Sequence, residues 1–190
     1  AAGSADVRIT YNKGEADAHH VVDEISSSGG KVESFYLDVL AQQQSALSEL
    51  LKDWIPTHMY YFVTPFIFAG VNGRISLKLL AEFNEYYITG FLGVLNPLID
   101  AGVKKIFYPS SVGIKEIPLN MGEYIVVKTA GEMLCQFLQK SYGGLKIYYP
   151  RLPRMSTDQT VSLLLHMNGE EPAPIMLEHL RLFRDMPITK

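Results

Sequence analysis

Short apolar runs alternate with longer stretches in which apolar residues recur every three or four positions. The short runs are typical of buried β-strands, and the longer stretches are typical of amphipathic helices. Strands are predicted at residues 5–12, 31–39, 58–65, 104–111 and 145–153. Helices are predicted at 15–30, 42–54, 76–102 and 124–140, and weaker helical patterns follow at 160–167 and 174–183.

A predicted helix separates each predicted strand from the next, so the strands are joined by long crossovers rather than by tight hairpins. Such crossovers join parallel strands and place helices over the sheet. We therefore predict an α/β fold, a Rossmann-like doubly wound parallel sheet with helices on both faces. In open sheets of this kind ligands bind beyond the carboxyl ends of the strands, so the residues that end each strand are the candidates for function.

The composition is that of a globular protein, with 47% hydrophobic and 19% charged residues among 190. We predict one domain over 1–190, in which segment 154–190 forms either a lid over the site or helices that pack on the core. The net charge of −3 and the scattered basic residues give no footprint for nucleic acid. The most apolar run contains Pro65 and is too short to cross a bilayer, so no membrane association is expected.

The single cysteine, Cys135, excludes an internal disulfide and suits a reducing compartment, so we expect a cytoplasmic protein. Its side chain is interpreted as a small buried hydrophobe, with a reactive thiol as the alternative. The five histidines do not have the spacing of metal ligands, and we predict no metal site.

Tyr124 and Lys128 lie four positions apart in a predicted helix, so both side chains project from one face. The spacing fits a catalytic pair and also one turn of an ordinary buried helix. A phenol has a pKa of about 10, so it needs a neighbouring cation to stabilise its oxyanion near neutral pH. Lys128 could be that cation, and Ser111, at the end of the preceding strand, could hold a substrate oxygen close to the tyrosine.

A second tyrosine and lysine, Tyr142 and Lys146, have the same spacing. The two glycines between them break a helix, so the side chains would not share a face. We expect no catalytic role for this second pair.

The arrangement of Ser111, with Tyr124 thirteen positions later and Lys128 after a further four, resembles the catalytic site of the short-chain dehydrogenase/reductase family. The resemblance runs from about Asp6 to Thr160 and is closest to ketoacyl-reductase-like members. It implies that Tyr124 donates a proton to the substrate, that Lys128 lowers the pKa of Tyr124 and holds the nicotinamide ribose, and that Ser111 positions the substrate oxygen.

The same resemblance implies a dinucleotide cofactor. It places Asn12 and Lys13 at the adenosine ribose and Asp38 beside the adenine. The cofactor-binding residues expected at the other strand ends are Val63, Thr64, Pro65, Pro150 and Arg151, together with Lys128. Because Lys13 follows the strand where NAD-binding members have an acidic residue, NADP (NADPH) is favoured over NAD. A solvated turn is the alternative interpretation of Lys13.

Three segments depart from the family pattern. The sequence VTPF replaces the Asn-Asn-Ala-Gly of the family, and PRLPRMSTDQT replaces a Pro-Gly. Tyr87 occupies the position at which many members place an asparagine of a proton relay. If the relay is incomplete for this reason, Tyr87→Asn should leave activity intact or raise it.

No glycine-rich turn between a first strand and a first helix is present in the sequence, although such a turn binds the cofactor pyrophosphate in dinucleotide-binding folds. By the resemblance, Ala1 lies one βα unit into the domain. We therefore expect an N-terminally incomplete domain, with about 30 further residues before Ala1 or the same unit supplied by a partner chain.

The function implied by the resemblance is an NAD(P)-dependent reduction of a ketone or ketoacyl carbonyl to a secondary alcohol, on a small-molecule or carrier-bound substrate. The departures leave two alternatives. One is a non-catalytic reductase-like domain that binds or scaffolds within a larger biosynthetic assembly, and the other is a nucleotide-sugar epimerase or dehydratase. A homo-oligomer or a larger assembly is the expected context.

Overall fold

The computed structural model describes residues 5–41, 44–155 and 171–187. Strands and helices alternate along these ranges, and every pair of hydrogen-bonded strands is parallel. The pairs are β1 (Asp6–Tyr11) with β2 (Lys31–Tyr36), β3 (His58–Tyr60) with β4 (Lys105–Phe107), β4 with β6 (Lys146–Tyr148), and β5 (Ser110–Ser111) with β7 (Arg151–Leu152). The predicted α/β class with parallel strands is confirmed.

Two prolines divide the central strands. β5 and β7 continue β4 and β6 in the same register, which places Pro109 opposite Pro150. Neither proline has an N–H to donate, so the ladder is interrupted there. It resumes where the backbone N–H of Ser110 donates to the carbonyl oxygen of Pro150 at 2.8 Å. The strands predicted at 104–111 and 145–153 are each split in two for this reason.

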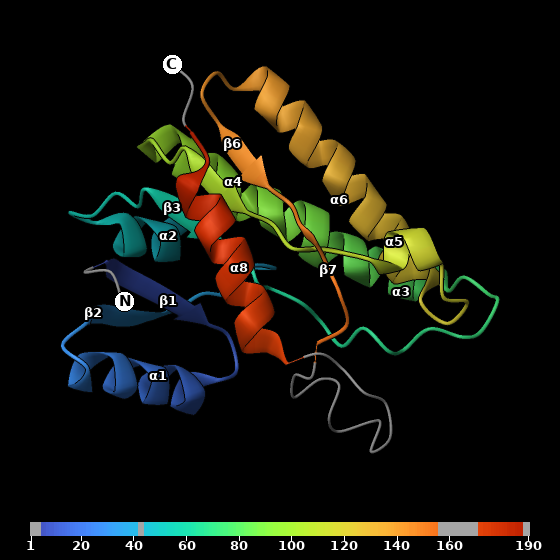
Figure 1. Ribbon diagram of the computed structural model, residues 1–190, viewed down its shortest axis with the longest axis horizontal. Helices are drawn as coiled ribbons and strands as arrows, with labels where there is room; N and C mark the ends of the chain where they lie inside the picture. Colours follow the sequence, from blue (N-terminus) through green and yellow to red (C-terminus); the bar gives the residue numbers. More distant parts are fainter. Residues whose placement is uncertain (1–4, 42–43, 156–170, 188–190) are drawn as a thin grey trace.

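The helices are distributed around the strands (Figure 1). Their bounds are α1 (Glu15–Ser27), α2 (Gln44–Leu51), α3 (Leu77–Asn84), α4 (Gly90–Ala101), α5 (Gly113–Glu116), α6 (Gly122–Ser141) and α8 (Pro172–Asp185). A π-helical turn, η1 (Glu85–Thr89), joins α3 to α4, so the long helix predicted at 76–102 is continuous. It ends at Gly102, whose φ of +109° suits a residue without a side chain. The helix predicted at 160–167 lies outside the described residues.

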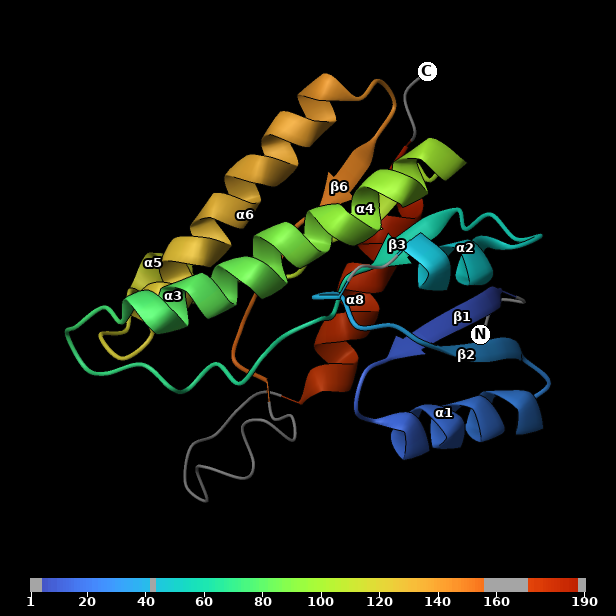
Figure 2. The same cartoon turned by 180° about the vertical axis from the view of Figure 1, so that it is seen from behind.

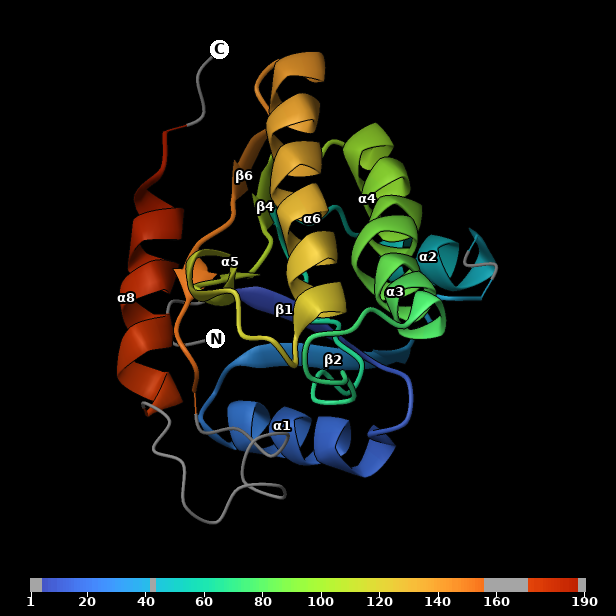
Figure 3. The ribbon, with the colours of Figure 1, turned by 90° about the vertical axis from the view of Figure 1, so that its right-hand side faces the viewer.

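Helices cover both faces of β3, β4 and β6. Figure 3 shows α4 and α6 on one face and α8 on the other. On the first face, Phe91 and Leu95 of α4 and Cys135 of α6 are fully buried and belong to the main hydrophobic core. On the second face, the fully buried ring of Phe183 in α8 contacts the ring of Phe107. No helix within the described ranges is long and apolar enough to cross a membrane.

β1 and β2 form a separate pair. In Figures 1, 2 and 3, β1 lies between β2 and the strands β3 and β4, yet no pairing joins β1 to β3 among the described residues. Arg8 in β1 makes one connection, because its guanidinium donates to the carbonyl oxygen of Leu50 and lies 4.8 Å from the ring centroid of Trp54. Leu37 and Val39, just after β2, make another, because both belong to the main hydrophobic core. Side-chain contacts therefore hold this pair of strands beside the rest of the sheet.

Candidate active site

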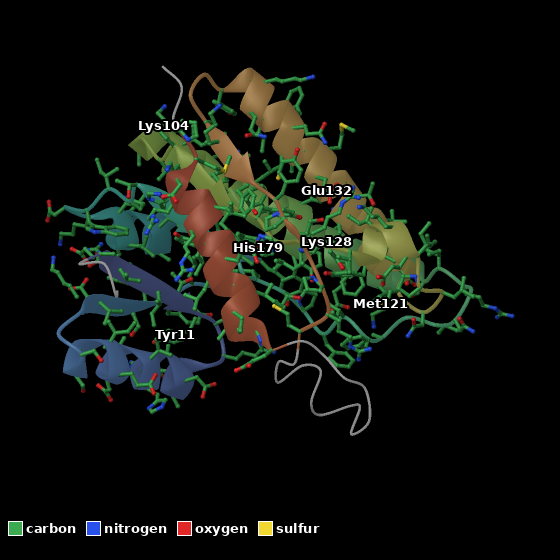
Figure 4. All side chains as sticks on the ribbon, viewed as in Figure 1. Tyr11, Lys104, Met121, Lys128, Glu132 and His179 are labelled. Atoms are coloured by element: carbon green, nitrogen blue, oxygen red, sulfur yellow. The ribbon has the colours of Figure 1, made fainter. Side chains whose placement is uncertain are left out.

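The end of β5 and the first half of α6 bring the three predicted catalytic residues together. Ser111 is the last residue of β5, and Tyr124 and Lys128 lie in the first two turns of α6. Both α6 side chains face the protein interior, with exposed fractions of 8% for Tyr124 and 4% for Lys128. Figure 4 labels Lys128 on α6, with Glu132 one turn further along the helix.

Ser111 lies beside the phenol of Tyr124. The backbone N–H of Gly113 donates to the Ser111 hydroxyl oxygen at 3.1 Å, which fixes that oxygen at the end of β5. The same side chain lies close to the Tyr124 phenol. Burial raises the pKa of Tyr124, and the Ser111 hydroxyl acts in the opposite direction because it favours the phenolate.

Lys128 lies in an aromatic cage. Its Nζ donates to the carbonyl oxygen of Pro109 at 2.7 Å. The ring centroids of Tyr87, Tyr108 and Tyr124 lie 3.9, 5.0 and 5.8 Å from Nζ. Burial lowers the pKa of Lys128 to about 7, since the cage excludes the water that would solvate the ammonium. The cation is therefore poised to titrate near neutral pH.

Tyr87 belongs to this site. Its ring is almost completely buried, and its hydroxyl lies 2.6 Å from Oγ1 of Thr64, just beyond the end of β3. Its backbone carbonyl oxygen, in the π-helical turn η1, accepts a hydrogen bond from the Tyr108 hydroxyl at 3.1 Å. Isolated π-helical turns within helices occur frequently at functional sites. The position that departs from the family pattern is thus next to the predicted catalytic lysine.

A second polar cluster lies one helical turn beyond Lys128. The Glu132 carboxylate accepts from the Ser110 hydroxyl at 2.5 Å and from Nε and Nη2 of Arg151 at 2.8 and 2.7 Å. The Arg151 guanidinium holds the pKa of Glu132 below its usual range. This cluster joins α6 to β5 and β7, so it fixes the strand end that carries Ser111.

Sequence reasoning missed Tyr108 and Glu132. Tyr108 ends a buried strand immediately before Pro109 and Ser110, so its position at the carboxyl end of the sheet was a usable signal. Glu132 lies four positions after Lys128 on a helix, and that spacing places it on the same face. Arg151 was predicted to bind the cofactor, and here its guanidinium is paired with Glu132.

The other residues predicted to bind the cofactor lie at strand ends. Asn12 and Lys13 are exposed just after β1, and Asp38 follows β2, where its Oδ1 accepts from the Leu40 backbone N–H at 3.0 Å. The remaining four follow β3 or lie between β6 and β7: Val63 is half-buried, Thr64 bonds Tyr87, and Pro65 and Pro150 are buried. Their contact with a cofactor stays a prediction.

Tyr142 and Lys146, the second pair with the same spacing, lie on different elements. Tyr142 caps the carboxyl end of α6 and is partly exposed, whereas Lys146 begins β6. The chain reverses between them at Gly144, whose φ is +79°. The two side chains do not form a site with Ser111 or with each other.

A cavity of about 250 Å³ lies between the segment after β2 and the long helix α3–η1–α4. Leu40, Leu47, Thr89 and Pro97 are among the residues that line it. None of the three predicted catalytic residues is in that lining. Within the described parts of the chain, no three His, Cys, Asp or Glu side chains are grouped as metal ligands.

Solved structures of reductases share this fold. The chain superposes on a short-chain dehydrogenase/reductase from Serratia marcescens with a TM-score of 0.81 and 15% identity, over 96% of this chain and 82% of that one. The alternative dihydrofolate reductase 1 (FolM) from Brucella suis, in complex with NADP, superposes with a TM-score of 0.77 and 12% identity, over 97% of this chain and 81% of that one. The 3-oxoacyl-(acyl-carrier-protein) reductase from Agrobacterium tumefaciens, with NADP bound, superposes with a TM-score of 0.78 and 13% identity, over 94% of this chain and 78% of that one.

No family model and no curated protein matches the sequence. The similarity is therefore one of three-dimensional structure. At 12–15% sequence identity it shows a shared fold. Three observations indicate the same fold: the parallel strands, the helices on both faces, and the superposition over nearly the whole chain. The resemblance drawn from the residues is confirmed at this level: the chain has the Rossmann-type α/β fold of the short-chain dehydrogenases/reductases.

Proposed function

We propose that the protein is an NADP-dependent oxidoreductase that reduces a carbonyl to a secondary alcohol, with Tyr124 as proton donor. The observation that carries the proposal is the convergence of Ser111, Tyr124 and Lys128, a neutral hydroxyl, a phenol and a cation, at the end of one strand. Bound NADPH would supply the hydride. The chain itself would supply the proton and orient the substrate oxygen.

Tyr124 acts as the general acid in this proposal. The phenol gives its proton to the substrate oxygen, and the phenolate that remains is stabilised by the Ser111 hydroxyl and by the Lys128 ammonium. Before the transfer, the single O–H of Ser111 donates instead to the substrate oxygen and holds it beside the phenol. Because burial lowers the pKa of Lys128 to about 7, this stabilisation is strongest below neutral pH, where the amine is protonated.

Residues at the end of β1 fit the phosphate of NADP. Lys13 is exposed there beside Asn12, and a lysine ammonium is a suitable partner for a 2′-phosphate. Asp38 at the end of β2 is close to its own backbone, where it accepts from Leu40 N–H. The NADP-bound state of two structures with this fold is in line with this preference.

The test is a titration of the protein with NADPH and NADH, followed by fluorescence of the bound nicotinamide. We expect Lys13→Ala to weaken NADPH binding at least tenfold and to leave NADH binding nearly unchanged, because the variant loses a charge that only the 2′-phosphate uses. Product analysis with a panel of ketones and carrier-bound ketoacyl substrates then tests the reaction. Equal weakening of both cofactors would contradict the assignment of Lys13.

The second candidate function is a non-catalytic reductase-like domain that binds a partner within a larger assembly. The burial of Tyr124 and Lys128 favours it, and so does the position of the 250 Å³ cavity, away from both side chains. The same titration separates the two candidates. A folded chain, including its natural flanking segments, that binds neither cofactor would favour the second.

We propose self-association through the exposed face of α6. Val126, Met133 and Phe137 are exposed along one side of that helix with Ala130 between them, and so large an apolar stripe is costly in water. A second copy presenting the same stripe would cover it by two-fold symmetry. Sedimentation of Met133→Lys/Phe137→Lys should give a lighter species than that of the parent protein.

A further inference from the structure

The nearest aromatic face to the Lys128 ammonium is that of Tyr87, and not that of the predicted proton donor. Nζ lies 3.9 Å from the Tyr87 ring centroid, compared with 5.8 Å for Tyr124. An ammonium within about 6 Å of a ring face is attracted by the ring's negative quadrupole, and most strongly where water is excluded. Lys128 and Tyr87 are both buried, so this attraction acts without screening by solvent.

The Tyr87 ring is held in place from several sides. Thr64 Oγ1 donates its hydrogen to the carbonyl oxygen of Pro65 at 3.1 Å, so the Tyr87 hydroxyl is the donor in its own bond to Thr64 at 2.6 Å. The rings of Phe83 and Tyr124 pack against Tyr87 at centroid distances of 6.1 and 5.8 Å. The hydroxyl is therefore committed to Thr64, and the ring face is what remains for Lys128.

We propose that Tyr87 is a positioning residue whose ring face keeps the Lys128 ammonium charged and in place beside Tyr124, with Thr64 fixing the orientation of that ring. The effect of Tyr87 on catalysis rests on the proposed function of Lys128 and Tyr124. The contact between the Tyr87 ring and Lys128 does not depend on that function. An asparagine at position 87 has no such face. This contact therefore argues against the expectation that Tyr87→Asn leaves activity intact.

Besides the Pro109 carbonyl oxygen, which accepts from Nζ, the titratable groups that face Lys128 come from three elements. They are Tyr87 from η1, Tyr108 from the end of β4, and Tyr124 and Cys135 from α6. Burial lowers the pKa of Lys128 to about 7, and the neighbouring thiol acts weakly in the opposite direction. The Tyr87 face favours the charged amine, so weakening that face must lower the pKa of Lys128 further, by about one unit if the face is lost completely.

The test is an NMR titration of Lys128 in protein labelled with ¹³C at the lysine ε carbon, with Lys128→Arg to assign the signal. Phenylalanine and its mono-, di- and trifluorinated forms are introduced at position 87, because fluorine withdraws charge from the ring face with little change in size. We expect the pKa of Lys128 to fall stepwise from the phenylalanine variant to the trifluorinated one. The phenylalanine variant is the reference for the series because it has already lost the hydroxyl that bonds Thr64. A pKa that is constant across the series would overturn the proposal.

The same fluorinated series at Phe83 is the matched control. Phe83 is equally buried and contacts the Tyr124 ring, so it disturbs the packing of the site without lying over Lys128. We expect it to leave the pKa of Lys128 unchanged, and a fall as large as at position 87 would also overturn the proposal. Because the titration needs neither cofactor nor turnover, its outcome is independent of whether the protein binds NADPH.

In an active protein the NMR pKa of Lys128 can be compared with the pH dependence of turnover. If the proposed function holds, the pH at which kcat falls should move along the position-87 series by the same increments as the NMR pKa of Lys128. A merely structural role for Tyr87 would change the amount of folded protein and would not move that pH. A moving NMR pKa with a fixed kinetic profile would refute the catalytic part alone.

Discussion

Gly131 leaves just enough room for the Tyr108 hydroxyl. A Cβ atom at position 131 would lie 2.3 Å from that oxygen, far inside any normal contact. The hydroxyl is held where it is by its hydrogen bond to the carbonyl oxygen of Tyr87. A glycine in the middle of α6 thus sets the position of one wall of the Lys128 cage.

We expect Gly131→Ala to lower the free energy of unfolding by about 1–3 kcal/mol, since Tyr108 must move in a packed interior. Gly93→Ala is the control, because Gly93 also lies within a helix and has open space around its Cα. That variant should be neutral or more stable by up to about 1 kcal/mol. Urea unfolding measures both, and equal effects would show that the contact with Tyr108 is tolerated.

Tyr124→Phe removes one hydroxyl from a buried ring of nearly unchanged size, so the variant should fold. If Tyr124 is the proton donor, turnover should fall by about 10²-fold or more. Tyr142→Phe removes a hydroxyl from the second tyrosine of this spacing and should be nearly silent, because Tyr142 lies at the far end of α6. Wild-type turnover in Tyr124→Phe would rule out its assignment.

Two neighbouring serines offer a matched pair of variants. The Ser111 side chain lies close to the Tyr124 phenol, whereas the Ser110 hydroxyl donates to the buried carboxylate of Glu132. We expect Ser111→Ala to reduce turnover by at least tenfold, and also to lower stability because the buried Gly113 N–H loses its acceptor. Ser110→Ala should lower stability by about 1–3 kcal/mol and affect turnover less. Thermal unfolding and steady-state kinetics measure both variants. A larger loss of turnover in Ser110→Ala than in Ser111→Ala would contradict the assignment of Ser111.

The pair of Arg151 and Glu132 should make stability depend on pH. The guanidinium holds the pKa of Glu132 below its ordinary value, so the pair contributes stability above the unfolded pKa of about 4.3 and loses it as pH falls through the lower, folded pKa. Arg151→Met should therefore destabilise the protein at pH 7, because the Glu132 carboxylate is left without its partner, and much less at pH 3.

The control for that prediction is Arg184→Met. Arg184 also pairs with a carboxylate, that of Asp185, but both side chains are exposed to solvent. Exposed pairs contribute little, so the variant should be as stable as the parent protein at either pH. Chemical denaturation at the two pH values gives the comparison. A stability gap for Arg151→Met that does not shrink in acid would mean that packing, and not the charge, is lost.

The strands and helices could be predicted because their patterns are local. The helical period over 76–102 and the apolar run at 104–111 need no knowledge of distant residues. The break within the central strands is different in kind. It depends on Pro109 lying opposite Pro150, which is a matter of register between segments far apart in the chain.

The candidate site divides in the same way. The joint position of Tyr124 and Lys128 follows from helical spacing, and Ser111 follows from its place at a strand end. The role of Tyr87 could not be read from the sequence. The departure from the family pattern was visible, but the contact of its ring with Lys128 arises where η1 packs against α6.

Because no ladder hydrogen bond joins β1 to β3 among the described residues, we expect the unit of β1, α1 and β2 to open more easily than the unit of β3, β4 and β6. The first unit is held by Arg8 and by Leu37 and Val39, which follow β2 and belong to the main core. The proposed adenosine contacts, Lys13 and Asp38, belong to the first unit or follow it directly, and Tyr124 and Lys128 belong to the second. A dinucleotide that contacts both units would stabilise the closed arrangement. Its apparent affinity would be reduced by the free energy needed to keep the first unit closed.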